Sequence, residues 1–116
     1  EDAACALALQ TGGVVAVTGA WDFVTDGDTA WRIDNGHPLM PRITVMGCSL
    51  TGVVGAFLVG QDALPATVAA LAYYGLAGER AGAAAQGPGS FQPAFQDALY
   101  TLGPDDVTRG AKVTQA

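Results

Sequence analysis

The sequence predicts an α/β fold in which a buried parallel strand and a β-hairpin pack against three or four helices. Residues 14–17 form a continuous apolar run, rich in β-branched side chains and bounded by glycines, which is typical of a strand buried on both faces. An Asp-Gly pair then joins two segments of alternating character and indicates a hairpin. The remaining chain carries alanine and leucine at helical spacing. A helix, a glycine turn and a buried strand in succession are typical of an α/β unit.

The first helix is predicted over residues 1–10, where alanine and leucine predominate. Residues 11–13, Thr-Gly-Gly, end it, because glycine tolerates the positive φ with which many helices terminate. The hairpin is predicted to pair residues 20–25 with residues 29–33 across a turn at residues 26–28.

Residues 47–60 are predicted to form a buried helix, because their apolar side chains recur at helical spacing. Gly52 and Gly55 cost helix propensity of roughly 1 kcal/mol each relative to alanine, so we expect a neighbouring element to approach the helix closely at both positions. Asp62 is the expected cap of the next helix, which extends to about residue 85. Its side chains are nearly all small or apolar, which is typical of a helix buried in a large core or against another subunit.

The Gly-Pro-Gly sequence within residues 86–90 interrupts the helices, and Ser90 is the expected N-cap of a last helix over residues 91–102. The apolar side chains of that helix lie on one stripe: Phe91, Phe95, Ala98, Leu99 and Leu102. After the Gly-Pro pair that ends the helix, we expect residues 105–116 to form a loose polar tail.

Composition excludes several classes of function. Half of the 116 residues are apolar, so one domain with a sizeable core is expected. The net charge of −6, with five lysines plus arginines and no basic run, argues against a nucleic-acid surface or an anionic membrane surface. Two cysteines without partners at ligand spacing predict neither a disulfide framework nor a metal site, and fit a cytoplasmic protein. Because the chain starts with Glu1 inside an apparent helix, we expect a fragment or a processed chain.

The strongest candidate for chemistry is the junction at which Gly47 and Cys48 lead into an apolar helix. The first amides of a helix lack partners and lie at the positive end of its dipole, so they can bind an anion. A cysteine in this first turn is placed to act as a thiolate base or nucleophile. The alternative is that Cys48 is a small apolar residue packed under the helix start, and the pair alone does not separate the two interpretations.

Other polar residues are better explained by local structure. His37 lies in an Asn-Gly-His-Pro turn and is assigned no catalytic role. Asp22 and Asp26 lie within the predicted hairpin and are interpreted as turn residues rather than as a catalytic or metal-binding pair. Residues 87–90, Gly-Pro-Gly-Ser, lack the lysine and the preceding strand of a phosphate loop. Tyr73, Tyr74 and Gly75 could wall an adenine pocket, but a place in the core or at a subunit interface is the simpler interpretation.

Five sequence blocks in fixed order resemble the carboxyl-terminal half of hydroxyethylthiazole kinase. They are VAVTGAWDFVTDG at residues 15–27, NGHPLMPRIT at 35–44, Gly47-Cys48, AGER at 77–80 and GPGSFQPAFQDALY at 87–100. The resemblance implies a partial ribokinase-like fold, with residues 1–104 forming the carboxyl-terminal portion of a kinase domain and residues 105–116 a polar tail. It also implies the family's reaction, phosphorylation of the primary alcohol of 4-methyl-5-(2-hydroxyethyl)thiazole with ATP and Mg²⁺ in thiamine salvage.

The resemblance assigns roles residue by residue. Thr18 matches the family's ATP-contacting threonine, and Cys48 matches the cysteine that stands where related sugar kinases carry a catalytic aspartate. Cys48 would accept the hydroxyl proton while Gly47 and the helix amides hold the transferring phosphoryl group. Family members are trimers with active sites at subunit boundaries, so a homo-oligomer is expected.

Two departures from the family pattern bear on activity. The family has Gly-Thr or Gly-Ala before the Gly-Cys pair, whereas this chain has Val45 and Met46. The first glycine of the family is a thiazole contact, and a β-branched residue there would be strained if φ is positive. We therefore predict that Val45 and Met46 weaken or abolish kinase activity. The family's thiazole pocket, its acidic magnesium-organising residues and a basic ATP contact come mainly from the amino-terminal half, which nothing in this chain matches.

Three functions therefore remain open from the sequence. The chain is the carboxyl-terminal part of a hydroxyethylthiazole kinase, a non-catalytic remnant of that fold, or a self-associating structural domain. The last rests on the almost wholly apolar residues 66–85, which need a partner surface.

Overall fold

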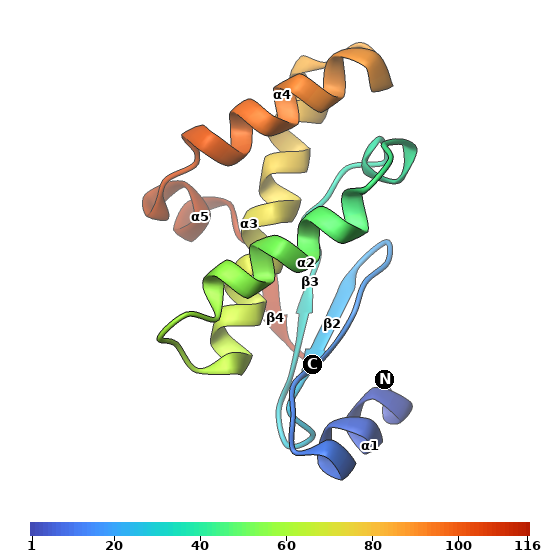
Figure 1. Ribbon diagram of the computed structural model, residues 1–116, viewed down its shortest axis with the longest axis vertical. Coiled ribbons are helices and arrows are strands. Elements are labelled where there is room, and N and C mark those ends of the chain that lie inside the picture. The colour runs from blue at the N-terminus through green and yellow to red at the C-terminus, as the bar shows by residue number, and fades with distance from the viewer.

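The computed structural model describes residues 1–116 and shows a four-stranded sheet surrounded by five α-helices (Figure 1). In chain order the elements are α1 (Asp2–Thr11), β1 (Val15–Val17), β2 (Asp22–Thr25), β3 (Ala30–Ile33), a 3₁₀ helix η1 (Met40–Arg42), α2 (Met46–Phe57), α3 (Ala63–Ala84), α4 (Pro88–Thr101), α5 (Pro104–Gly110) and β4 (Val113–Gln115). The molecule measures 43 × 26 × 23 Å, with α1 at one end of the long axis and α4 at the other (Figure 1). The predicted α/β class is confirmed.

The hairpin of β2 and β3 forms as the sequence predicts. The two strands pair antiparallel, with Asp22 opposite Ile33 and Thr25 opposite Ala30. Gly27 has φ +100° in the turn, where any other residue would be strained. The Asp26 carboxylate accepts hydrogen bonds from the amides of Asp28 at 3.0 Å and Thr29 at 2.8 Å, which is the turn chemistry expected of an aspartate there.

Helices cover both faces of the sheet. Val24 packs with Leu71 of α3 in one buried cluster, whereas the hydroxyl of the adjacent Thr25 lies 3.6 Å from the sulfur of Cys5 in α1. Successive side chains of a strand point to opposite faces, so α3 and α1 lie on opposite sides of β2. α1 ends as predicted, with Gly12 at φ +70°.

The prediction of a buried parallel strand at residues 14–17 is wrong for this chain. β1 pairs antiparallel with β2 and forms the edge of the sheet, in the order β1-β2-β3-β4. Ala16 is exposed and Val17 is 51 % exposed. An apolar, β-branched run indicates that a strand is suited to burial, but burial also needs a neighbouring element. In this chain no element lies along the free edge of β1 to cover it.

α2 is also less enclosed than its sequence predicts. The helix forms close to the predicted bounds, but none of its residues is buried. A Cβ atom added at Gly52 or Gly55 would meet nothing within 4 Å. The expected close approach of a neighbouring element at these glycines therefore does not occur within this chain.

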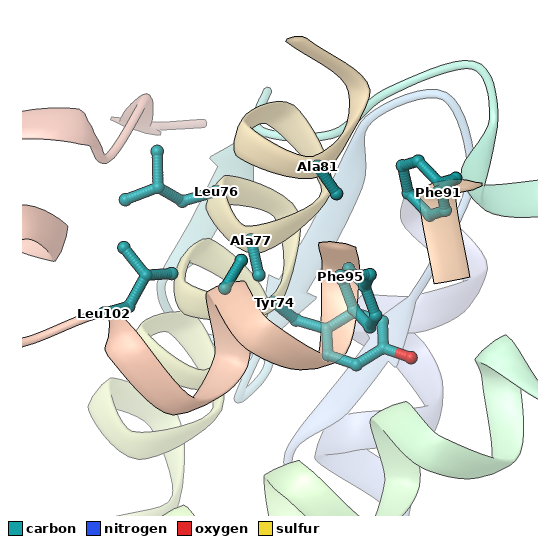
Figure 2. Packing of buried hydrophobic residues seen from close by; sticks show 8 residues of the cluster. Tyr74, Leu76, Ala77, Ala81, Phe91, Phe95 and Leu102 are labelled. Atoms are coloured by element: carbon teal, nitrogen blue, oxygen red, sulfur yellow. The ribbon is translucent and has the colours of Figure 1, made fainter. Parts of the chain in front are cut away.

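α3 is the central helix, with eleven buried residues along its 22 positions. Asp62 precedes it as predicted, although its side chain makes no capping hydrogen bond. A cluster of eight buried residues joins α3 to α4 (Figure 2). It contains the predicted stripe residues Phe91, Phe95, Ala98 and Leu102. No helix in the structure is both long enough and apolar enough to cross a membrane.

Two details near the carboxyl end differ from the prediction. α4 begins at Pro88 with Gly87 as its N-cap, so Ser90 lies inside the first turn rather than before it. The expected loose tail is instead ordered, because residues 104–110 form α5 and β4 pairs with β3, placing Val113 opposite Ile33. The division of the chain at residue 104 into kinase domain and tail is not tested by these contacts.

Candidate functional site

A cavity of about 750 Å³ lies where the loop after β1, the loop after β3 and the start of α2 meet. Thr18, Gly19 and Asp22 line it from the sheet, and Tyr74 and Gly75 line it from α3. The remaining wall consists of Asp34 to Pro38, Met40, Pro41, Met46, Gly47, Leu50, Leu71 and Ala20. Thr18 and Gly47, which lie 29 positions apart in the sequence, therefore share one cavity.

The start of α2 presents unpaired amides. The helix has no side-chain cap, and the amides of Met46, Gly47 and Cys48 donate to no acceptor in the chain. The amide of Ser49 is the first to be paired, donating to the Val45 carbonyl at 2.9 Å. A Cβ atom on Gly47 would meet nothing within 4 Å, so the approach to these amides is open. Such a helix start attracts an anionic group.

Cys48 lies in the first turn of α2 and is an exposed free thiol. It is not a wall residue of the cavity itself, but it follows Gly47, which is. The interpretation of Cys48 as a small residue packed beneath the helix start is therefore wrong for this chain. Cys5, by contrast, is partly buried, with its sulfur 3.6 Å from the Thr25 hydroxyl.

Val45 is the only non-glycine residue with a positive φ, at 73° with ψ 10°. The left-handed region is costly for L-residues and most of all for β-branched ones. The side chain is 58 % exposed and outside the cavity wall. Val45 therefore has the backbone strain that we predicted for a β-branched residue if its φ were positive.

The wall formed by the loop after β3 is anchored by Asn35, a residue that sequence reasoning did not single out. Its side chain is only 5 % exposed. The Asn35 amide group donates to the Glu79 carboxylate at 2.8 Å and to the Gly110 carbonyl at 2.9 Å, and its oxygen accepts from the Lys112 amide at 2.7 Å. Lys112 also forms an ion pair with Glu79. One side chain thus ties the loop to α3 and to the segment between α5 and β4.

Glycines of α3 give the same loop room to lie against the helix. A Cβ at Gly75 would come within 2.7 Å of the Asn35 backbone, and one at Gly78 within 2.3 Å of the Met40 sulfur. A Cβ at Gly82 would come within 2.2 Å of the His37 ring. The spacing of three and four residues places all three on one face of the helix. That spacing is the signal in the sequence that could have revealed this contact.

His37 behaves as the sequence predicts and also lines the cavity. Its Nδ1 atom accepts a hydrogen bond from the Leu39 amide at 3.1 Å, as a turn-bonding histidine does. The ring stacks on Phe91 with centroids 6.1 Å apart. Its place in the cavity wall comes from the fold of the loop rather than from any sequence motif.

The two aspartates of the hairpin differ in environment. Burial raises the pKa of Asp22, although a hydrogen bond from the Gly19 amide at 3.1 Å opposes the rise. Hydrogen bonds from the Thr29 and Asp28 amides lower the pKa of Asp26. Asp22 makes a turn contact as predicted, yet it also points a partly buried carboxyl toward the cavity that Thr18 lines.

Among residues 1–116 no group of three His, Cys, Asp or Glu side chains lies close enough together to hold a metal ion. Asp22 and Asp34 are the two carboxylates that line the cavity.

Comparison with known proteins gives a consistent result. Residues 1–105 match the hydroxyethylthiazole kinase family. A hydroxyethylthiazole kinase of Cereibacter sphaeroides is 60 % identical over 116 residues, which are 100 % of this chain and 44 % of that protein. One of Desulfotalea psychrophila is 50 % identical over 111 residues, or 95 % of this chain and 41 % of that protein.

The fold agrees with a solved structure as well. The hydroxyethylthiazole kinase of Pyrococcus horikoshii OT3 superposes with a TM-score of 0.93 at 37 % identity, covering 97 % of this chain and 44 % of that one. The chain thus spans less than half the length of each of these three proteins.

Proposed function

The chain belongs to the hydroxyethylthiazole kinase family, and we propose that it forms the carboxyl-terminal part of an enzyme that phosphorylates the primary alcohol of hydroxyethylthiazole with ATP. One observation supports this most directly. The unpaired amides at the start of α2 and the Thr18 loop border the same cavity, as a site that holds a phosphoryl group beside a nucleotide requires.

We assign this chain three roles in the reaction: the base, the amides that hold the phosphoryl group, and one contact to ATP. As the alcohol oxygen bonds to the γ-phosphorus, the bond from that phosphorus to ADP breaks and the hydroxyl proton passes to the Cys48 sulfur, which acts as the base. The amides around Gly47 hold the charge on the transferring group, and Thr18 contacts ATP. The metal ligands, the thiazole pocket and a basic ATP contact belong to parts of the enzyme outside this chain. In the complete enzyme we expect a homotrimer, as the family resemblance implies.

A chimera tests the proposal. This chain would replace the matching segment of the Cereibacter sphaeroides relative, which is 60 % identical across all 116 residues. We expect ATP-dependent phosphorylation of hydroxyethylthiazole, reduced by roughly 10²-fold or more in Cys48→Ala, as for loss of a general base. Cys5→Ala is the matched control, because that thiol lies on α1 against Thr25. Equal rates in the two variants would contradict the role of Cys48.

Val45 and Met46 are proposed to lower this activity. Val45 holds a left-handed backbone where the family has glycine, and Met46 adds bulk at amides that should receive phosphate. Replacing them by Gly and Thr in the chimera should raise the phosphorylation rate. An unchanged rate would show that both residues are tolerated.

Exposed apolar side chains support a second candidate, a self-associating module without catalysis. Leu7, Leu9 and Val59 are 49 %, 62 % and 79 % exposed, and α2 has no buried residue despite its apolar composition. Sedimentation of the isolated chain would reveal the oligomer. An inactive chimera together with a stable oligomer of the isolated chain would favour this candidate over the kinase.

A further inference from the structure

The side chain of Tyr74 reaches from α3 to the start of α2. Its hydroxyl donates a hydrogen bond to the Met46 carbonyl at 2.7 Å. Met46 is the first residue of α2 and is followed by Gly47 and Cys48. No other element of the chain places a side-chain hydrogen bond on the first turn of this helix.

The donor is held firmly in place. Tyr74 is 3 % exposed, and its ring meets the edge of Phe95 with centroids 4.9 Å apart. Figure 2 shows the ring within the buried cluster and its oxygen pointing away from the cluster. Burial raises the pKa of Tyr74, opposed by a hydrogen bond from Ser49, so the hydroxyl remains a protonated donor at neutral pH.

At its start, the helix that receives this bond is held by the partly buried Met46 and Leu50, which pack against the α3–α4 cluster, and by few polar contacts. It has no side-chain cap, it follows a strained Val45, and it contains no buried residue. The direction of its first amides and of the Cys48 side chain therefore depends on what fixes the first turn. Small displacements of such groups are costly to catalysis, because the reacting atoms must be held in a narrow range of geometry.

We propose that Tyr74 is a positioning residue, which holds the Met46 carbonyl and thereby fixes the orientation of the first turn of α2, where Gly47 lines the cavity and Cys48 follows it. The inference rests on the proposed function for its effect on catalysis. Its effect on Cys48 can be measured without any kinase activity.

The neighbouring Tyr73 provides a matched control. Its hydroxyl also donates to a backbone carbonyl, that of Leu99 in α4. Burial raises its pKa too, and its ring contacts Phe57 at the far end of α2. Tyr73→Phe therefore removes the same atom from the same helix without touching the first turn of α2.

The first test measures alkylation of the full chain by iodoacetamide across pH 6–9, with Cys48 and Cys5 followed separately by peptide mass spectrometry. We expect Tyr74→Phe to change the Cys48 rate by threefold or more at neutral pH and to shift its pH profile. Cys5 serves as the internal reference and should keep its rate. Tyr73→Phe should leave both thiols unchanged. Equal Cys48 profiles in the two tyrosine variants would overturn the inference.

The second test uses the chimera. Tyr74→Phe should lower kcat about tenfold while the KM for ATP stays within twofold, and Tyr73→Phe should leave kcat unchanged. An active chimera whose kcat is insensitive to Tyr74→Phe would also overturn the inference. If the unaltered chimera is itself inactive, the proposed function fails, and the alkylation profiles decide the role of Tyr74 by themselves.

Discussion

Replacing Val45 with glycine should stabilise the chain, because Val45 is the one non-glycine residue held at positive φ. The left-handed conformation costs an L-residue about 1–2 kcal/mol, and a β-branched residue stands at the upper end of that range. Glycine avoids this strain. It also loses about 0.5–1 kcal/mol through the greater freedom of the unfolded chain.

Val45→Gly also removes apolar contacts of the valine side chain, which costs less free energy than the strain it relieves. Val45 is 58 % exposed, so the side chain buries less than half of its surface, and full burial of a valine is itself worth only about 1.5 kcal/mol or a little more. A comparison of glycine with alanine at the same position removes most of this contribution, since both substitutions delete the valine methyl groups. Alanine retains the Cβ atom and hence the strain.

The assay is urea unfolding of the chain followed by circular dichroism. Val45→Gly should be more stable than Val45→Ala by about 1 kcal/mol. The same pair at Val59, which is 79 % exposed and has an ordinary φ, provides the control. There the order should reverse, with glycine about 0.5–1 kcal/mol less stable than alanine. If alanine is the more stable residue at both positions, the strain at Val45 does not exist and the reasoning fails.

Three further predictions concern the glycines of the helices and the two aspartates of the hairpin. Gly75→Ala places a Cβ 2.7 Å from the Asn35 backbone and should destabilise the chain by about 1–3 kcal/mol in urea. Gly52→Ala, in open space on α2, should instead stabilise it by up to about 1 kcal/mol. Asp22→Asn should be more stable than the unaltered chain at pH 7, because burial raises the pKa of Asp22 in the folded state. The unaltered chain therefore loses stability as the pH rises from 3.8 through the folded-state pKa. In thermal melts below pH 3.8 the two proteins should have the same stability. Asp26→Asn should melt at a lower temperature than the unaltered chain at pH 7, because amide hydrogen bonds lower the pKa of Asp26 in the folded state. The difference in melting temperature should shrink as the pH falls below 3.8 through the folded-state pKa. A difference that does not depend on pH would contradict this prediction.

Local chemistry explains which elements could be predicted. The Asp26-Gly27 turn fixes the hairpin because glycine at φ +100° and a carboxylate that accepts nearby amides both act within four residues. The stripe from Phe91 to Leu102 identifies α4 because helical spacing is itself local.

Burial was harder to predict than secondary structure. The apolar pattern of β1 and of α2 indicates surfaces suited to burial, but it does not say which element covers them. In this chain β1 is an edge strand and α2 has no buried residue. Both expectations failed for that reason, since burial depends on a neighbour and not on the residues alone.

Some residues of the candidate site could be predicted from the sequence, and others could not. Thr18, Val45, Gly47 and Cys48 are identified through residues that resemble the family. The structure places Thr18 and Gly47 in the wall of one cavity, with Val45 and Cys48 outside that wall at the start of α2. Asn35 and Tyr74 were not assigned to the site, because their partners lie 28 to 77 positions away in the chain.

The sequence by itself determined the α/β class, the hairpin, four of the five α-helices and the family. These features follow from turn chemistry, hydrophobic spacing and the order of the motifs, which can all be read along the sequence without knowing which distant residues meet. Only the tertiary structure decided that Val45 is left-handed, that Asn35 anchors the cavity wall and that Tyr74 reaches the start of α2. Those features arise because packing α3 against the sheet and α2 brings distant side chains together, and no local pattern specifies which of them will meet.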